Sequence, residues 1–362
     1  MLYIPPEVQA NWPEPNYEDP VTRGPGLIII VLTFHVLATI MVALRSVTRL
    51  FITLSFGLDD VLTIIALIPT TGVAATVLLA NMKYGWDRHI WDLVPENVKP
   101  GIQLGFAGTI LFSVAAGLCR LALCAFYYRL LPSRGTKIYP WVIWGFASFS
   151  SVGSIVFVFW LAFLCKPAKA YFDFVPPLYE PPYPYSCRSR YVAKLTACVL
   201  NVFCDLFTVL LPMPLVWRLR LPLRQRLIVI ATFGLGAAVV VVSALKTKYL
   251  VASVRDSYDE QWDAYPLWIC GIIELDTSLI CASAPALRPL VTRYFPNALG
   301  TIRMTYRRSS PPGLVEAAAA AAKHAAAGLQ MDHNNRDSDQ SLIKLQNQRH
   351  VQSYSSMPLT PD

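Results

Sequence analysis

One long apolar stretch of the chain carries an amide and a carboxylate near its middle. Tyr191–Val216 is long enough to cross a bilayer, for which roughly 20 residues suffice, and it contains Asn201 and Asp205. A spacing of four places both side chains on one face of a helix. Because an ionisable group is costly at membrane depth, Asp205 should face a protein interior or a wet cavity. The pair therefore predicts a polar site inside a membrane bundle.

Further titratable side chains stand roughly midway along other apolar stretches. His35 lies in the first, and Glu274 and Asp276 lie in the last, two residues apart and therefore on different faces. In a closed ring the first and last helices are neighbours, so His35 should face one of the two acids. Burial favours the neutral form of a carboxyl group and makes it a candidate general acid. The candidates for such catalysis are Asp205, Glu274, Asp276, His35 and His89.

Three cations accompany these acids. Arg120 lies nearer the cytoplasmic end of its stretch, and its side chain can reach Asp205 or Asp60. Lys246 and Lys248, near the outer end of theirs, are expected to extend toward the interface. Two interpretations remain open: the charges tie helices together, or they line a polar cavity that opens to the outside. For a cavity, the candidate ligand-contacting residues are Asn201, Asp205, Arg120, Glu274 and Trp91.

A histidine stands in the first outer loop, Tyr84–Asp92, where it would lie at the mouth of such a cavity. His89 titrates near neutral pH, and Asp87 and Asp92 are expected to orient or charge it. Its neighbour Trp91 equally suits the membrane interface, where such rings are common. One histidine and two carboxylates lack a fourth ligand, so no metal site is predicted.

A pair of aspartates begins the second apolar stretch at its other end. Asp59 and Asp60 are expected to cap a helix, where carboxylates satisfy free N–H groups and interact favourably with the helix dipole. Arg45 and Arg49 are the expected ion-pair partners. This role is structural rather than catalytic.

The elements that must position these residues are seven apolar spans. A spanning segment has to satisfy its own backbone hydrogen bonds, which favours helices, whereas barrel strands would alternate over about ten residues. We therefore expect an all-α membrane protein, a seven-transmembrane helix bundle. The spans are predicted at about Gly26–Arg45, Asp60–Ala80, Gly101–Tyr128, Trp141–Leu164, Tyr191–Val216, Leu227–Val251 and Tyr265–Leu287.

The segments around the bundle differ in composition. Residues 1–25 are expected to form an extracellular or lumenal tail, residues 26–297 the membrane domain, and residues 298–362 a cytoplasmic and mostly disordered tail. Lys and Arg are more numerous beside the span ends on the C-terminal side. This bias places the C-terminus in the cytoplasm and the N-terminus outside.

Composition supports lipid as the solvent. The chain has 362 residues, of which 54% are hydrophobic and 15% are charged, whereas a soluble domain has about 25% charged residues. The formal net charge is +8, but the Lys and Arg residues lie mainly in short gaps between apolar runs. This is the pattern of membrane-flanking residues and excludes a nucleic-acid-binding protein.

Two of the eight cysteines lie at the outer boundary. Cys165 and Cys187 bracket one loop in an oxidising compartment, where a disulfide between them is predicted. Closure of about twenty residues contributes about 3 kcal/mol on the chain-entropy model. The alternative is two free thiols.

Seven short motifs occur in order along the chain: Gly57-Leu-Asp-Asp60, Gly85…His89-Ile-Trp91, Tyr127-Tyr-Arg129, Cys165-Lys-Pro167, Asn201…Asp205…Leu211-Pro-Met-Pro214, Glu274 and Pro285-Ala-Leu-Arg-Pro289. In this order they resemble the fungal rhodopsin-domain family of seven-helix integral membrane proteins. The resemblance covers about residues 24–297. It implies a fungal source, seven spans and relatives without established activity, including satratoxin-cluster-type proteins and the membrane part of surface-sensing receptors.

The resemblance does not extend to retinal. A Schiff base needs a lysine amine, and the last span, Tyr265–Leu290, contains none, so no cofactor is expected. The family also more often has Gly where Asp87 stands, Lys at Arg120 and Arg at Lys246. The latter two exchanges keep a cationic site, whereas Asp87 is a departure in the outer loop.

Three functions follow as hypotheses. The first is a receptor-like protein that binds a small lipophilic ligand and shifts its cytoplasmic face toward a signalling partner, with an association to fungal secondary metabolism implied by the resemblance. The second is a membrane enzyme for acid–base cyclisation or isomerisation of a hydrophobic metabolite. The third is a transporter, which the lack of two similar halves disfavours. In each case the protein is a multi-pass protein of the plasma membrane or an endomembrane.

Overall fold

The computed structural model describes residues 6–131, 138–173, 182–214, 223–256, 258–287 and 289–290. The chain separates into two units, Met1–Leu299 and Gly300–Asp362, and all described residues belong to the first. The tail predicted for residues 298–362 lies outside them.

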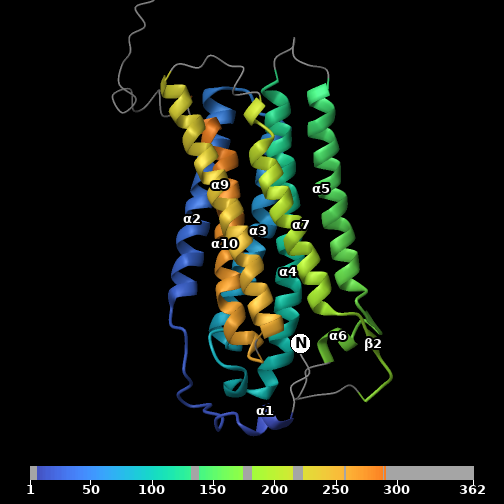
Figure 1. Cartoon of the computed structure of the whole chain (residues 1–362). Coiled ribbons are helices and arrows are strands. Elements are labelled where there is room, and N and C mark those ends of the chain that lie inside the picture. The colour runs from blue at the N-terminus through green and yellow to red at the C-terminus, as the bar shows by residue number, and fades with distance from the viewer. Residues whose placement is uncertain are drawn as a thin grey trace, which may run out of the picture. The chain divides into compact units, whose positions relative to one another are not determined.

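Seven of the described helices are long and apolar enough to cross a membrane, which confirms the seven-helix prediction. A short helix, α1 (Pro6–Ala10), precedes them near the N-terminus (Figure 1). The seven are α2 (Gly26–Val47), which continues as the π-helical turn η1 (Thr48–Ile52), α3 (Leu58–Tyr84), α4 (Pro95–Arg129), α5 (Ile138–Ala162), α7 (Arg190–Leu210), α9 (Leu223–Val251) and α10 (Glu260–Ser283).

Local sequence accounts for several helix ends. Pro95 occupies the first turn of α4, where its missing N–H costs nothing, so α4 begins before the predicted Gly101. Gly85 follows α3 with φ of 67°, a left-handed conformation that glycine adopts without steric cost. α7 ends at Leu210 rather than Val216, because Pro212 has no N–H to continue the helical bonds.

Two helices form the centre of the bundle. In an apolar 18-residue stretch of the span that contains α10, 61% of the residues are buried, and in that of α4 50%, against 22% in those of α2, α5 and α7. A core cluster joins α2, α3, α4 and α10 through Val31, Val73, Val77, Ala115 and Leu275. The peripheral helices therefore present most of their surface outward.

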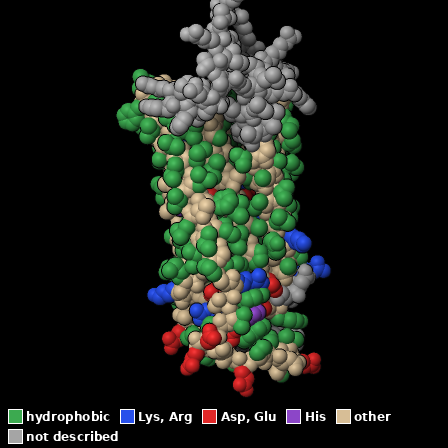
Figure 2. All heavy atoms as spheres, turned by 90° about the vertical axis from the view of Figure 1, so that its left-hand side faces the viewer, with side chains coloured by type: hydrophobic (Ala, Val, Ile, Leu, Met, Phe, Trp, Pro, Cys, Tyr) green, Lys and Arg blue, Asp and Glu red, His purple; other side chains and the backbone are tan. Residues whose placement is uncertain are grey.

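That outward surface is apolar. Figure 2 shows hydrophobic side chains over the middle of one face, with charged groups gathered at the end that carries α1 and the first loops. On α2, Ile29 is 59% exposed and Val36 53%. An apolar surface of this extent marks contact with a membrane rather than with water. The seven apolar helices and this surface identify a multi-pass membrane protein.

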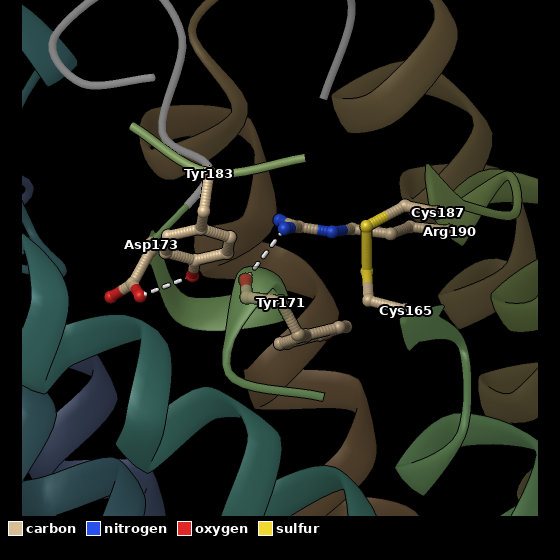
Figure 3. Close-up of a disulfide and its surroundings, with 6 residues drawn as sticks. All are labelled: Cys165, Tyr171, Asp173, Tyr183, Cys187 and Arg190. Carbon is tan, nitrogen blue, oxygen red and sulfur yellow. Dashed lines mark hydrogen bonds between the residues drawn. A yellow bond between two sulfur atoms is a disulfide. The ribbon is translucent and has the colours of Figure 1, made fainter. Parts of the chain in front are cut away.

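One end of the bundle carries the disulfide. Cys165 and Cys187 are joined and belong to the paired strands β1 (Cys165–Lys166) and β2 (Ser186–Cys187) (Figure 3). The short helix α6 (Ala170–Asp173) lies beside them. We call this the disulfide end. It also carries η2 (Ile90–Asp92) and the π-helical turn η3 (Ala252–Asp256) that follows α9.

Side-chain contacts hold α6 in place. Arg190 donates a hydrogen bond from Nη2 to the carbonyl oxygen of Tyr171 at 2.6 Å (Figure 3). The hydroxyl of Tyr183 donates to Asp173 Oδ2 at 2.6 Å, and Lys99 Nζ lies 2.6 Å from Asp173 Oδ1. Hydrogen bonds from Lys99 and Tyr183 keep the pKa of Asp173 below its usual range.

The opposite end, which we call the Asp59 end, is held by a buried charge cluster. Arg45 is 1% exposed and donates to Asp59 Oδ2 at 2.5 Å and Asp60 Oδ1 at 2.8 Å. Asp60 also accepts a hydrogen bond from the backbone N–H of Gly57 at 3.0 Å, so it caps α3. Arg129, which was not predicted as a partner, donates to Asp59 Oδ1 at 2.9 Å. The final turn of the last span, η4 (Ala284–Leu287), lies at this end.

Candidate functional site

An ion pair stands where Asn201 and Asp205 were predicted to form a polar spot. Arg120 on α4 donates from Nη2 to Asp205 Oδ1 at 2.8 Å and to Asn201 Oδ1 at 2.6 Å. Arg120 and Asp205 are each 7% exposed. Asp205 and Asp60 were the two partners expected for Arg120. Arg120 pairs with Asp205 on α7, whereas Asp60 belongs to the separate cluster at the Asp59 end.

Asn201 joins this pair to a second acid. Its Nδ2 lies 3.0 Å from Asp205 Oδ2, 2.9 Å from Ser243 Oγ and 2.6 Å from Glu274 Oε1. The bond that Oδ1 accepts from Arg120 sets the orientation of the amide. Because an amide nitrogen has only two hydrogens, the three acceptors share two donors. Asn201 therefore has more than one way to distribute its hydrogen bonds.

Lys246 completes the network and corrects one prediction. It was expected to extend toward the interface, but it is 5% exposed, and its Nζ lies 2.6 Å from Glu274 Oε2. A lysine this deep needs a buried counter-charge, and Glu274 on α10 supplies it. We call the set Arg120, Asp205, Asn201, Ser243, Glu274 and Lys246 the polar network; it spans α4, α7, α9 and α10.

His35 and Asp276 form a separate group. His35 Nδ1 lies 3.1 Å from Asp276 Oδ1, and Nε2 lies 3.1 Å from Thr71 Oγ1. Of the two partners expected for His35, the structure therefore takes Asp276 and not Glu274. Asp276 is fully buried, and its Oδ2 has no hydrogen-bond partner in the described part of the chain. This group joins α2, α3 and α10 and does not line the cavity described next, so His35 and Asp276 do not share that cavity with Arg120 and Asn201.

A cavity of about 170 Å³ lies against the polar network. Its walls come from α4, α5, α7, α9 and α10. Arg120, Asn201 and Lys246 line it together with Lys194 and with apolar and aromatic side chains that include Phe112, Phe157 and Trp268. We call it the central cavity. Its apolar walls with a few convergent polar groups are the usual character of a small-molecule site.

We infer that the central cavity opens sideways between α5 and α7, because lining residues of both helices are also exposed. Phe149, Gly153 and Leu200 line it and are also exposed on the outer surface; Phe149 is 50% exposed and Leu200 45%. An added Cβ on Gly153 would meet no atom within 4 Å. The contacts between α5 and α7 lie on either side of this point, in the clusters around Ile143 and Leu161.

A second cavity of about 110 Å³ adjoins the first on the side of the disulfide end. Its lining includes Trp86, Arg190 and Glu260. The two cavities share Thr109, Lys194, Leu250, Leu267 and Trp268. We call it the end cavity. Lys194 Nζ lies 3.5 Å from Glu260 Oε1, at the boundary between the two.

His89 has different partners from those predicted. Its Nδ1 lies 2.5 Å from Asp259 Oδ2, and its ring is stacked between Trp91 and Trp262 at centroid distances of 4.5 and 3.8 Å. Asp87 and Asp92 do not pair with it in the described structure; Asp92 instead accepts from the backbone of Asn16 at 3.0 Å. The pair belongs to the N-cap of α10, because Asp259 also accepts from the N–H of Trp262.

Asp259 and Trp91 both lie in this His89 group. Burial raises the pKa of Asp259, and its hydrogen bond with His89 opposes that shift. Trp91 lines neither the central nor the end cavity, although it was proposed as a ligand-contacting residue.

Within the described residues, no group of three or more His, Cys, Asp or Glu side chains is placed to hold a metal.

Sequence reasoning missed Ser243 and Lys194, and it assigned Lys246 to the interface instead of the site. Ser243 and Lys246 lie three residues apart on α9, a spacing that places them on one face of a helix, and that pattern was a usable signal. Lys194 stands two turns before Asn201 on α7, where it was read only as part of an apolar stretch. The depth of each lysine was visible, but the helix it would face was not.

Comparison with known proteins adds two kinds of relative. Receptor GIN3 of Arthrobotrys oligospora is 28% identical over 228 residues, which are 62% of this chain and 51% of that protein. Fugralins biosynthesis cluster protein 2 of Gibberella zeae is 22% identical over 321 residues, 87% of this chain and 77% of that protein. This chain thus spans about half the length of the first.

A third relative is named as a membrane protein of the SAT4 family. An SAT4 family membrane protein of Emericella nidulans is 24% identical over 242 residues, 65% of this chain and 58% of that protein. No solved structure matches the chain significantly. The fungal rhodopsin domain matches residues 44–293, a range that contains the whole polar network and both cavities, and the chain therefore belongs to the fungal rhodopsin family.

Proposed function

We propose that this protein is receptor-like and that its central cavity binds a small lipophilic ligand taken from the bilayer. The observation that carries the proposal is that residues of α5 and α7 line the cavity and are also exposed on an apolar outer surface, from which we infer an opening between these helices. A compound dissolved in the membrane reaches such a cavity without crossing water. A link to fungal secondary metabolism is part of the proposal and is supported by relatives named for biosynthesis clusters.

The polar network would transmit the presence of the ligand. Arg120, Asn201 and Lys246 line the cavity from three different helices, so a ligand there touches α4, α7 and α9 together. A ligand shifts a conformational equilibrium only by its differential affinity for the two states. The shared hydrogens of Asn201 offer two such states, and we propose that α9 carries the change to a cytoplasmic signalling partner.

We propose non-covalent binding without retinal, because α10 contains no lysine. Acid–base catalysis is less well supported than binding, since a general acid must reach the ligand with a proton to give. Asp205 and Glu274 are each paired with a buried cation. His35 and Asp276 do not line the central cavity.

A matched pair of variants on α5 tests the opening. Gly153→Trp places an indole in it, whereas Gly145→Trp places one on the same helix at a second exposed glycine that does not line the cavity. Neither added Cβ meets an atom within 4 Å, so both variants should fold. The purified proteins, in lipid nanodiscs, are incubated with a diazirine-bearing octanol, and labelled residues are mapped by mass spectrometry.

Wild type and Gly145→Trp should show saturable labelling of cavity residues. Gly153→Trp should need about tenfold more probe, which corresponds to about 1.4 kcal/mol of lost affinity. Equal labelling of the three proteins, or labelling of lipid-facing residues alone, would contradict the proposal.

A distance measurement tests the receptor-like part separately. Spin labels at Val61→Cys on α3 and Leu235→Cys on α9, both exposed positions, should change their separation when the cavity is saturated with the octanol probe. Saturable binding with an unchanged distance distribution would indicate a binding protein that does not switch.

A further inference from the structure

We propose that the ligand of the central cavity carries an anionic head group, such as a carboxylate, and that Lys194 binds this group. The inference rests on the proposed function, because it assigns a chemical class to the ligand of the same cavity. Its basis is the sign of the charges that face the cavity and the unequal pairing of those charges.

Every charged side chain that lines the central cavity, among the residues described, is a cation: Arg120, Lys194 and Lys246. The acids that pair with the first and the last, Asp205 and Glu274, are absent from the lining. Both ion pairs are thus turned with the positive end toward the cavity. Oriented pairs of this kind give a positive potential in a low-dielectric space, which favours an anion and disfavours an amine.

The three cations differ in how tightly they are already paired. Arg120 and Lys246 lie 2.8 and 2.6 Å from carboxylate oxygens, and both side chains are at most 8% exposed. Lys194 lies 3.5 Å from Glu260 and is 26% exposed. An ammonium group has three donors, so Lys194 can accommodate a further acceptor with the least disturbance.

The position of Lys194 also suits an amphiphile. It lines both cavities, whereas Asn201, seven residues later on α7, lies two turns or roughly 10 Å deeper. Between them α7 presents Ala197 and Cys198 to the central cavity. A head group on Lys194 would therefore leave an apolar body along α7, beside the opening to the bilayer.

The test compares three photoreactive probes that share one diazirine-bearing eight-carbon chain and end in a carboxylate, an amine or an alcohol. Each is applied to the full-length protein in nanodiscs of zwitterionic lipid. The variants are Lys194→Gln, Lys194→Arg and Glu260→Gln. Lys166→Gln, at an exposed lysine of the same end that lines neither cavity, is the matched control.

In wild type the acid should label cavity residues at about tenfold lower concentration than the amine, as expected for one charge-assisted hydrogen bond. Lys194→Gln should abolish this preference, whereas Lys194→Arg and Lys166→Gln should retain it. Glu260→Gln should strengthen labelling by the acid, because it removes the carboxylate that competes for Lys194. A merely structural role of Lys194 does not produce that gain.

The outcomes separate this inference from the proposed function. If the alcohol labels the cavity but acid and amine label equally, the anionic head group is wrong and the lipophilic site stands. If the preference for the acid survives Lys194→Gln, Lys194 is not the residue that binds it. If none of the three probes labels the cavity, both the inference and the proposed function fail.

Discussion

Asn201 forms hydrogen bonds with both ion pairs of the central site, Arg120–Asp205 and Lys246–Glu274. It accepts from Arg120, and its amide nitrogen lies within 3.0 Å of three acceptors, one of which belongs to Glu274. Its side chain therefore links α4, α7, α9 and α10 at one point. A substitution there acts on the whole network.

We expect Asn201→Leu to lower the free energy of unfolding by about 1–3 kcal/mol, the usual cost of leaving buried polar groups unpaired. Denaturant titration in mixed micelles measures the effect. Val199→Ala, at a lipid-facing position two residues away that is 54% exposed, should change stability much less. A stable Asn201→Leu protein would mean that the network contributes little to folding.

The pair Lys246–Glu274 permits a double-mutant cycle. Lys246→Met or Glu274→Met alone leaves one buried charge without its partner, which costs about 3–5 kcal/mol. The double variant Lys246→Met/Glu274→Met should lose less than either single variant, because no uncompensated charge remains. Losses in the double variant equal to the sum of the two single losses would show that the pair is not coupled.

At the scale of single residues, the sequence predicted which polar groups are buried better than it predicted their partners. Asp205 and Glu274 were identified from their depth in apolar stretches. Lys246 was assigned to the interface, because its depth along α9 does not tell which helix it faces. Partner choice depends on helix rotation and neighbour order, and neither is encoded in the periodicity of one stretch.

The disulfide organises the elements of one end. The sequence separation of the linked cysteines is 22, and a loop of that length is worth about 3 kcal/mol on the chain-entropy model. We expect Cys165→Ser/Cys187→Ser to lower the melting temperature and to increase hydrogen exchange in α6. Cys198→Ala, which removes a free thiol, should have a smaller effect on both measurements.

The attachment of α6 should also depend on pH. The pKa of Asp173 is lowered by Lys99 and Tyr183, so its contribution to stability is complete above its ordinary pKa of about 4 and is lost as pH falls through the lowered value. The melting temperature should decline more steeply toward pH 3 in wild type than in Asp173→Asn. Parallel curves for the two proteins would exclude this role.

Helix ends were predicted where a local signal exists. The predicted cap is confirmed for Asp60, which accepts from the backbone N–H of Gly57, and the predicted pairing with Arg45 is confirmed for both Asp59 and Asp60. The extension of α4 back to Pro95 was missed, because the polar residues before Gly101 lack the apolar pattern by which the span was recognised. The α5–α7 opening arises from how two helices pack, which no single helix reveals.

For the whole molecule, the direction in the membrane stays a prediction from the distribution of Lys and Arg. A tag at the N-terminus should be reached by antibody or protease in intact spheroplasts. A C-terminal tag should be reached only after permeabilisation. Both tags on one side would contradict an odd number of crossings.

The number of spans and the membrane class were predictable at this scale, because they depend on the length and apolarity of each stretch. The sequence did not predict that the buried charges divide into a polar network and a separate His35–Asp276 group. This division depends on which helices α10 contacts on each of its faces. Among the described spans, the one that contains α10 has the largest buried share. One face of α10 contributes Glu274 to the polar network, and another contributes Asp276 to the group with His35.

The charges around the central cavity cancel: each of the three cations that line it has one carboxylate partner. An incoming anion would upset this electroneutrality, and a medium of low dielectric constant tolerates net charge poorly. Uptake of the octanoate probe should therefore draw a proton from solution. Calorimetric titrations in buffers of different ionisation enthalpy would then give different apparent heats of binding. The slope of the apparent binding enthalpy against the buffer ionisation enthalpy would give the number of protons taken up with each ligand.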